Sequence, residues 1–167
     1  MISDKIKNLD EIENIVRGAK ERGEIIVTTN GCFDLPHSAH YRLFEKAKGL
    51  GDKLVVLING DNYLRQTKRE PIQTETDRAY MIASLQCVDF VSLFHEATVL
   101  ESLEKIKPHI HVKGGSYIPE RIRAEKELLA QWGGRLHLFD LEEGYSTSNL
   151  INRVIARYEN GQLNKRE

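Results

Sequence analysis

Two histidines three residues apart, His37 and His40, follow the first apolar run of the chain. On the first turn of a helix this spacing projects both imidazoles to one side, beside the free amides and the positive dipole end of the helix N-terminus. Imidazole can donate hydrogen bonds to phosphoryl oxygens, and a protonated ring neutralises charge that grows on them. Gly31, earlier in the same loop, allows a tight turn that brings backbone amides close to an anion. The pattern predicts a phosphate-binding site. A plain surface pair and a zinc site are the alternatives, although no third ligand with suitable local spacing accompanies the histidines.

Five short apolar runs predict the strands that position this loop. The run from Leu54 to Ile58 shows no alternation, which is typical of a strand covered on both faces. Segments with helical spacing lie between the runs, so consecutive strands need crossover connections. The sequence therefore predicts an α/β fold, a Rossmann-like, doubly wound and mostly parallel five-stranded sheet with helices on both faces. The expected strands are Glu24–Thr29, Lys53–Asn59, Asp89–Phe94, His109–Lys113 and Arg135–Phe139.

The remaining segments predict how the rest of the chain is organised. An amphipathic helix, Leu9–Glu21, precedes the first strand and is stopped by Gly23. The segment Glu120–Leu129 is expected to be a solvated helix face whose ion pairs carry little energy. The polar stretch between Asp61 and Pro71 is expected to be a mobile connection. We expect one domain over 1–167, with a helical extension at 1–22 and a tail at 160–167.

Composition limits the partners that the chain is expected to have. The 167 residues include 24 basic and 25 acidic side chains, which give a net charge of −1. A protein held on nucleic acid or an anionic membrane by its overall field is not expected from this balance. The longest aliphatic run has the length of a strand, and the first twenty residues lack the apolar core of a signal peptide. These features predict a cytoplasmic protein with no nucleic-acid or membrane partner.

Ligands of doubly wound sheets bind beyond the carboxyl ends of the strands, and two further segments there carry anion-binding groups. The run Lys113-Gly-Gly115 offers a point charge and lets a ligand lie against the backbone, although a plain turn with a solvated lysine has the same sequence. Ser146 and Thr147 open the last helix, where a serine is expected to cap the helix. The amides of that N-terminus can also form a second anion site.

Charged residues near the strand ends leave several readings open. Asp34 and Asp61 could orient the histidines, bind ribose or help to hold a metal ion. Arg78 lies at a helix start, where the dipole disfavours a cation, so an anion is expected nearby, with Asp77 as a possible partner. The basic residues Arg65, Lys68 and Arg69 either close over a bound phosphate ligand or are solvated charges.

The run Thr-Asn-Gly-Cys-Phe-Asp followed by His-x-x-His resembles the nucleotidyltransferase superfamily, the cytidylyltransferase-like proteins, whose signature is His-x-Gly-His. Within it the chain is most similar to the adenylyltransferases that act on D-glycero-beta-D-manno-heptose 1-phosphate in ADP-heptose synthesis. The resemblance extends from about Ile25 to Val154. Besides the first loop it rests on five blocks in the same order: Ala47–Asp52, Asp77–Ala79, Cys87–Asp89, Val112–Gly115 with Tyr117, and Gly144–Thr147.

The resemblance implies a reaction in which AMP passes from ATP to a sugar 1-phosphate, heptose 1-phosphate first of all, and pyrophosphate leaves. Positioning and charge stabilisation provide the catalysis of such a step. Mg²⁺ is expected with the triphosphate. Alternatives are a cytidylyltransferase that uses CTP and a polyol phosphate such as glycerol 3-phosphate, and a non-catalytic nucleotide-binding subunit. Relatives commonly associate, and the N-terminal helix offers a contact, so a homodimer or higher homo-oligomer is expected.

The resemblance also implies roles for single residues. His37, His40 and Lys113 are expected to be catalytic. The nucleotide is expected on Asn30, Gly31, Cys32, Phe33, Asp34, His37, His40, Lys68, Lys113, Gly114, Tyr145, Ser146 and Thr147, and the acceptor on Asp61, Arg78, Gly115, Ser116 and Tyr117.

Two residues depart from the pattern of the relatives. Ala39 stands where the signature has glycine, and its methyl group is expected to crowd the nucleotide. Ser116 stands where relatives usually have aspartate, which is expected to change recognition of the acceptor's hydroxyls. Cys32 has no base partner in sequence and is interpreted as a packing residue.

Overall fold

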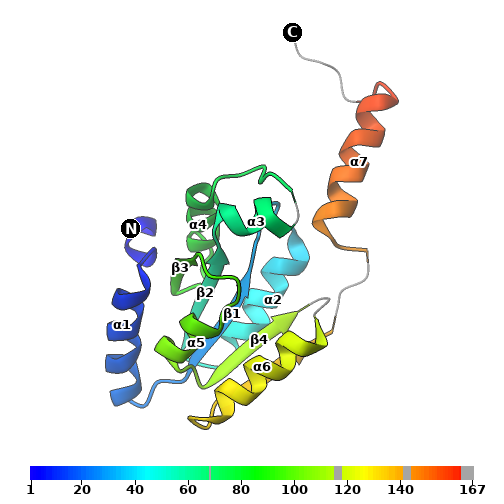
Figure 1. The fold of residues 1–167 in the computed structure, drawn as a ribbon. Coiled ribbons are helices and arrows are strands. Elements are labelled where there is room, and N and C mark those ends of the chain that lie inside the picture. The colour runs from blue at the N-terminus through cyan, green and yellow to red at the C-terminus, as the bar shows by residue number, and fades with distance from the viewer. Residues whose placement is uncertain (68, 115–117, 141–143, 163–167) are drawn as a thin grey trace.

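The sheet at the centre of the molecule is all-parallel, with strand order β3-β2-β1-β4-β5 (Figure 1). This computed structural model describes residues 1–67, 69–114, 118–140 and 144–162. Within them the strands are β1 (Ile26–Gly31), β2 (Lys53–Asn59), β3 (Phe90–Phe94), β4 (Ile110–Gly114) and β5 (Arg135–Phe139). The predicted fold class is confirmed. Strand β1 is displaced by two residues and β4 by one residue from the expected ranges, β3 begins one residue later than expected, and β2 and β5 have the expected bounds.

Helices cover both faces of the sheet. On one face lie α2 (Ser38–Lys48) and α4 (Glu75–Ala83), and on the other lie α1 (Leu9–Glu21), α5 (Leu100–Ile106) and α6 (Pro119–Ala130). Strand β2 packs into both layers, because Leu54, Val56 and Ile58 belong to the cluster under α2 and α4, whereas Val55 and Leu57 belong to the cluster under α1 and α5. All five side chains are fully buried, which explains why this run shows no alternation.

The first long helix has the bounds expected from its sequence. Asn8 and Glu11 form a reciprocal capping box at its start, each side chain accepting the other's backbone N–H at 2.9 Å. One side of α1 is buried against the sheet through Ile12, Val16 and Ala19. Its apolar face is therefore used inside the chain.

Several features of the helices differ from the expectations or add to them. The stretch after β2, expected to be a mobile connection, begins with a short helix, α3 (Asp61–Thr67), and α5 had no counterpart among the predicted elements. A 3₁₀ turn, Ile2–Lys5, precedes α1. The last helix, α7 (Thr147–Glu159), leads away from the sheet (Figure 1) and has no buried residue.

The order of the strands places a topological switch at β1. The chain runs outward from β1 through β2 to β3 and then returns to the other side of β1 as β4. The loops that follow β1 and β4 therefore diverge at neighbouring carboxyl ends and leave a crevice, which is where ligands bind in folds of this kind.

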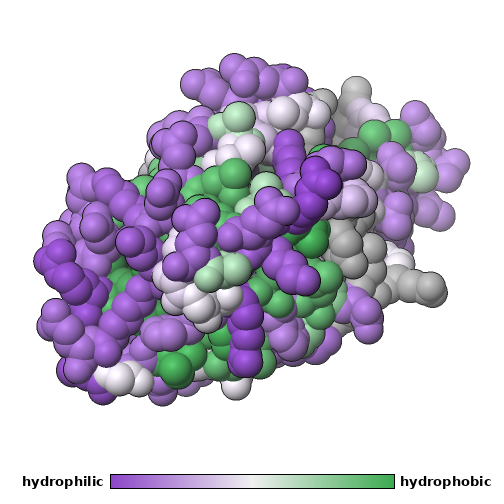
Figure 2. Space-filling model, turned by 60° about the horizontal axis from the view of Figure 1, so that its bottom comes forward, coloured by the Kyte–Doolittle hydropathy of each residue, from purple (hydrophilic) through white to green (hydrophobic). Residues whose placement is uncertain are grey.

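The outer surface is mainly polar on the face that Figure 2 brings forward, where hydrophobic residues show in patches between hydrophilic ones. Across the described ranges no helix combines the length and the apolar composition needed to cross a membrane.

Candidate active site

The loop after β1 is shaped by Phe33, whose backbone is left-handed, with φ of 50°. Residues other than glycine rarely adopt this backbone conformation, because it is strained. Here the strain is offset by the buried Phe33 ring, which packs edge-on against His40 and Phe44 with centroid distances of 5.3 Å and 5.1 Å. The ring also lies so close to Gly31 that a Cβ there would come within 2.7 Å of Phe33 Cζ. The residue with a positive φ in this turn is thus Phe33. Glycine is required at position 31 for a different reason, because the Phe33 ring leaves no room for a Cβ there.

The two histidines lie together at the start of α2. His37 is the N-cap residue, and its ring stacks on that of His40 with a centroid distance of 3.9 Å and an interplanar angle of 24°. The backbone N–H of His37 donates to Nδ1 of His40 at 3.3 Å. Because Nδ1 accepts this bond, the neutral His40 ring carries its proton on Nε2, which can donate to a ligand oxygen.

A residue distant in sequence joins the histidines. The ring of Tyr145 lies 6.0 Å from that of His37, and the guanidinium of Arg42 lies over the Tyr145 ring at 5.0 Å. Ser146 follows directly and caps α7, where its Oγ accepts the N–H of Asn149 at 3.0 Å. The predicted cap is confirmed, and Tyr145 lies beside the histidine pair.

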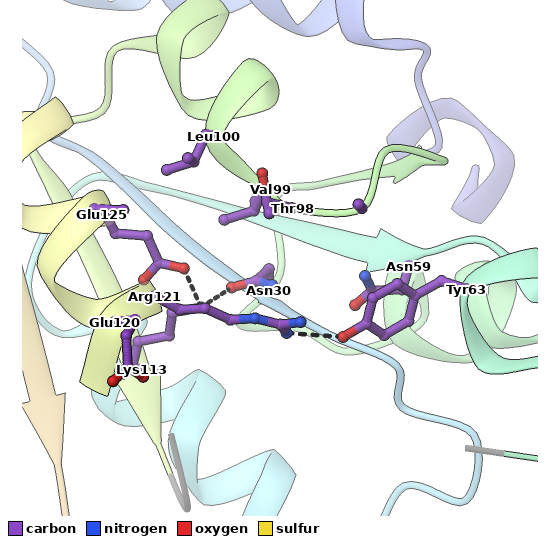
Figure 3. A pocket seen from close by; sticks show the side chains of 12 residues that line it. Asn30, Asn59, Tyr63, Thr98, Val99, Leu100, Lys113, Glu120, Arg121 and Glu125 are labelled. Carbon is purple, nitrogen blue, oxygen red and sulfur yellow. Dashed lines mark hydrogen bonds and ion pairs between the residues drawn. The ribbon is translucent and has the colours of Figure 1, made fainter. Parts of the chain in front are cut away.

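Lys113 lies at the switch point, at the end of β4. Its Nζ is 2.6 Å from Oδ1 of Asn30, the side chain near the end of β1, and 2.8 Å from Oε1 of Glu125 on α6 (Figure 3). These contacts line a pocket of about 200 Å³ on the α5 and α6 side of the sheet. The guanidinium of Arg121 reaches Tyr63 at its rim, at 2.8 Å. The pocket is lined by Asn30, Asn59, Tyr63, Ala97, Thr98, Val99, Leu100, Lys113, Glu120, Arg121, Ala124 and Glu125.

The expectation that Glu120–Leu129 forms a purely solvated face was wrong at Glu125, which is 4% exposed. Sequence reasoning missed this residue and its neighbour in the pocket, Arg121. A signal was present, because Glu125 stands three and four residues before Leu128 and Leu129, the apolar residues that turn α6 toward the sheet.

The anion expected near Arg78 is a residue of the chain itself. The guanidinium is fully buried and donates to Oδ1 of Asp61 at 2.7 Å, to the carbonyl oxygen of Cys32, and to that of Gln73 at 3.3 Å. Asp61 is therefore the partner of Arg78, rather than the neighbouring Asp77. Arg78 ties the loops after β1 and β2 to the segment that precedes α4.

Asp34 is also bound by protein groups. Its carboxylate accepts the backbone N–H groups of Ile72 and Gln73 at 3.0 Å and pairs with Arg69. Burial alone would raise the pKa of Asp34, but these hydrogen bonds and the arginine outweigh it and hold the pKa below its ordinary value. Arg65, by contrast, pairs with Glu70 at the surface.

Several expected site residues lie outside the described ranges, namely Lys68, Gly115, Ser116 and Tyr117. Gly114, the last described residue of β4, approaches α2 so closely that a Cβ there would lie 2.7 Å from Leu43 Cδ1. Among the residues that the structure places, no group of three His, Cys, Asp or Glu side chains is arranged to hold a metal ion.

Residues 28–153 match the model of the family described as cytidylyltransferase-like. The chain belongs to this family. The bifunctional protein HldE of Pelobacter propionicus is 45% identical over 156 residues, which are 92% of this chain and 32% of that protein. HldE of Helicobacter pylori is 40% identical over 86% of this chain and 30% of its own length. This cytidylyltransferase-like chain thus spans about a third of the length of the curated relatives it matches.

Two solved structures have folds similar to that of this chain. The lipopolysaccharide core biosynthesis protein of Thermoplasma volcanium is 27% identical, with a TM-score of 0.61 over 74% of this chain and 99% of that one. The pantoate-beta-alanine ligase of Francisella tularensis, solved in complex with beta-gamma ATP and beta-alanine, has a TM-score of 0.63 over 95% of this chain and 79% of its own, at 15% identity. The second likeness shows that this cytidylyltransferase-like chain shares the ligase's fold.

Proposed function

We propose that the chain transfers AMP from ATP to heptose 1-phosphate, giving ADP-heptose and pyrophosphate. The observation that carries the proposal is the arrangement at the switch point. The stacked pair His37 and His40 lies on one side of the end of β1, and Lys113 lies on the other side, in contact with Asn30. Family membership and the similarity to HldE proteins support the reaction class and the sugar phosphate acceptor.

Each group in this arrangement has a proposed role. An oxygen of the acceptor phosphate attacks the α-phosphorus of ATP, and the bond from that phosphorus to the bridging oxygen breaks, so that pyrophosphate leaves with the electron pair. His40 Nε2–H and the backbone amides at the start of α2 stabilise the charge that grows on the phosphoryl oxygens. Lys113 holds the triphosphate as a point charge, and the amides at Ser146 and Thr147 complete the clamp. We propose a positioning role for Arg78 and Asp34, because their charged groups are bound by the protein.

Mg²⁺ fits this site as a companion of the triphosphate. Three carboxylates of the site already pair with cations, Asp34 with Arg69, Asp61 with Arg78 and Glu125 with Lys113. Mg²⁺ keeps several waters and is commonly held by phosphates with few protein ligands. We therefore propose that Mg²⁺ would enter with the triphosphate rather than on these carboxylates, and that it would supply positive charge to the leaving pyrophosphate.

We assign the pocket beside Lys113 to the nucleoside of ATP, because its apolar lining can enclose a base while Lys113 and Asn30 face the phosphates. Ala124→Leu fills part of this pocket and is expected to raise KM for ATP roughly tenfold, the size of a lost close contact. Ala130→Leu, at an exposed site on the same helix, is the matched control. A rise in KM for the acceptor alone would assign the pocket to the sugar phosphate instead.

The reaction is tested by measuring pyrophosphate release with ATP, CTP, GTP and UTP, each paired with heptose 1-phosphate, other sugar 1-phosphates and glycerol 3-phosphate. We expect turnover with ATP and heptose 1-phosphate. A clear preference for CTP would refute adenylyl transfer, and nucleotide binding without turnover would identify a non-catalytic subunit. Two further proposals have their own tests. Sedimentation of the purified chain tests a homodimer or higher homo-oligomer, and a single cooperative unfolding transition is expected of a single domain over 1–167.

A further inference from the structure

A line of buried polar groups lies beneath the pocket, between β1, β4 and α6. Nδ1 of His111, a fully buried residue of β4, is 2.8 Å from Oγ1 of Thr28. Its Nε2 faces Oε2 of Glu125 at 4.0 Å, and Oε1 of Glu125 binds Lys113. The line ends at Asn30, which receives the second hydrogen bond of the lysine. Buried charged side chains of this kind need a function or a strong partner to be retained.

The two contacts of Lys113 also fix the direction of its third N–H group. A lysine ammonium has three N–H groups in tetrahedral arrangement. Two of them are directed at Asn30 and Glu125, which come from different elements and approach Nζ at 2.6 Å and 2.8 Å. Once two directions are fixed, the third N–H has a single direction left, and Lys113 itself lines the pocket.

The Glu125 carboxylate binds Lys113 and not the neighbouring ring of His111. Burial, and next the charge of Lys113, lower the pKa of His111 well below its ordinary value, so that the ring is neutral near pH 7. A cationic ring at this place would compete with the lysine for Glu125. The neutral ring stands 4.0 Å from the carboxylate, too far for a hydrogen bond.

We propose that Glu125 is a positioning residue, which orients the ammonium of Lys113 so that one N–H is presented to a phosphate group of a nucleotide whose nucleoside lies in the pocket. The inference rests on the proposed function in one respect, since it takes a phosphate as the ligand of Lys113. In this role the Glu125 carboxylate acts through Lys113, which it binds.

The experiment compares Glu125→Gln with Glu127→Gln, an exposed residue on the same helix. Glu125→Gln removes the charge that holds the lysine, so kcat/KM for ATP is expected to fall roughly ten- to a hundredfold, the worth of one charge-assisted hydrogen bond. The loss is expected mainly in KM, because phosphate is bound in the ground state and the transition state alike. Glu125→Asp keeps the charge but is one methylene shorter, and we expect it to restore only part of the loss.

Two measurements separate positioning from a merely structural role. The double variant Glu125→Gln with Lys113→Met is expected to have the same kcat/KM as Lys113→Met alone, because Glu125 has nothing left to orient. Thermal unfolding of each variant shows that the comparison is made on folded protein. An additive loss in the double variant would overturn the proposal, as would a kcat/KM for Glu125→Gln equal to or above that of the unchanged chain.

Binding measurements keep this inference apart from the proposed function. Calorimetric titration with ATP needs no acceptor, and Glu125→Gln is expected to weaken binding by roughly the same factor as it lowers kcat/KM. If ATP binding weakens while no acceptor supports turnover, the reaction is wrong and the role of Glu125 stands. If turnover is observed and the variant binds ATP as the unchanged chain does, the role of Glu125 is wrong and the reaction stands.

Discussion

Replacing the buried arginine of α4 with methionine tests whether Arg78 holds the loops of the site together. Arg78→Met keeps most of the side-chain volume but removes every donor to Asp61, Cys32 and Gln73. The Asp61 side chain is only 15% exposed, so its carboxylate is left without a cation in a poorly solvated place. Breaking a buried pair from one side costs about 3–5 kcal/mol. We expect the free energy of unfolding to fall by about 4 kcal/mol.

Urea denaturation measures this loss, and a second variant isolates its cause. In Arg78→Met with Asp61→Asn the stranded charge is gone, so about half of the lost stability is expected to return. Arg65→Met removes an exposed guanidinium from its pair with Glu70 and should change stability by less than about 0.5 kcal/mol. A loss below about 1 kcal/mol in Arg78→Met, or a double variant no more stable than the single one, would refute the reasoning.

Three further changes have definite expected results. His40→Ala should lower kcat several hundredfold with the fold intact, in line with losses of about 10²–10³ for single charge-stabilising donors, and a near-normal rate of pyrophosphate release would remove that role. Burial lowers the pKa of His111 in the folded chain, so below about pH 6.5 the unfolded chain binds a proton at this residue and the folded chain does not. The free energy of unfolding should therefore fall below that pH by up to about 1.4 kcal/mol per pH unit. His111→Gln should flatten this slope in urea titrations at several pH values, leaving the part due to His109, whose pKa burial also lowers. An unchanged slope contradicts the assignment. Gly51→Ala would place a Cβ 2.8 Å from the carbonyl oxygen of Ile25, so a loss of about 1–3 kcal/mol is expected on thermal unfolding, and an unchanged Tm would contradict the close approach.

The strands and α1 could be predicted because their sequence signals are local. An uninterrupted apolar run such as Lys53–Asn59 has the bounds expected, since burial on both faces leaves little room for polar residues. In α1 the N-cap residue Asn8, the buried apolar positions and the glycine that follows the helix, Gly23, all indicate the same bounds. The short helix α3 was missed because it has seven residues and buries only Leu64, which gives no periodic pattern.

The part of the site that is formed by residues close in sequence could be predicted. The contacts between residues of different elements could be predicted only in part. The spacing of His37 and His40 is enough to bring their rings together on one turn of helix. The partners of Lys113 and Arg78 come from other elements, and charge and spacing along the chain do not show which carboxylate each cation meets. The sequence therefore predicts a solvated ion-pair residue at Glu125 and leaves the role of Asp61 open, whereas in the structure both carboxylates bind buried or half-buried cations.

The central position of β1 in the sheet affects when the ligand-binding crevice forms during folding. Asn30 and Lys113, which meet across β1 and β4, are separated by 83 positions of chain. Contacts this distant in sequence form late, because closing so long a loop is entropically costly until the intervening strands have docked. The crevice should consequently appear only with the last cooperative step of folding, so that a truncated or half-synthesised chain has secondary structure but no place for a ligand.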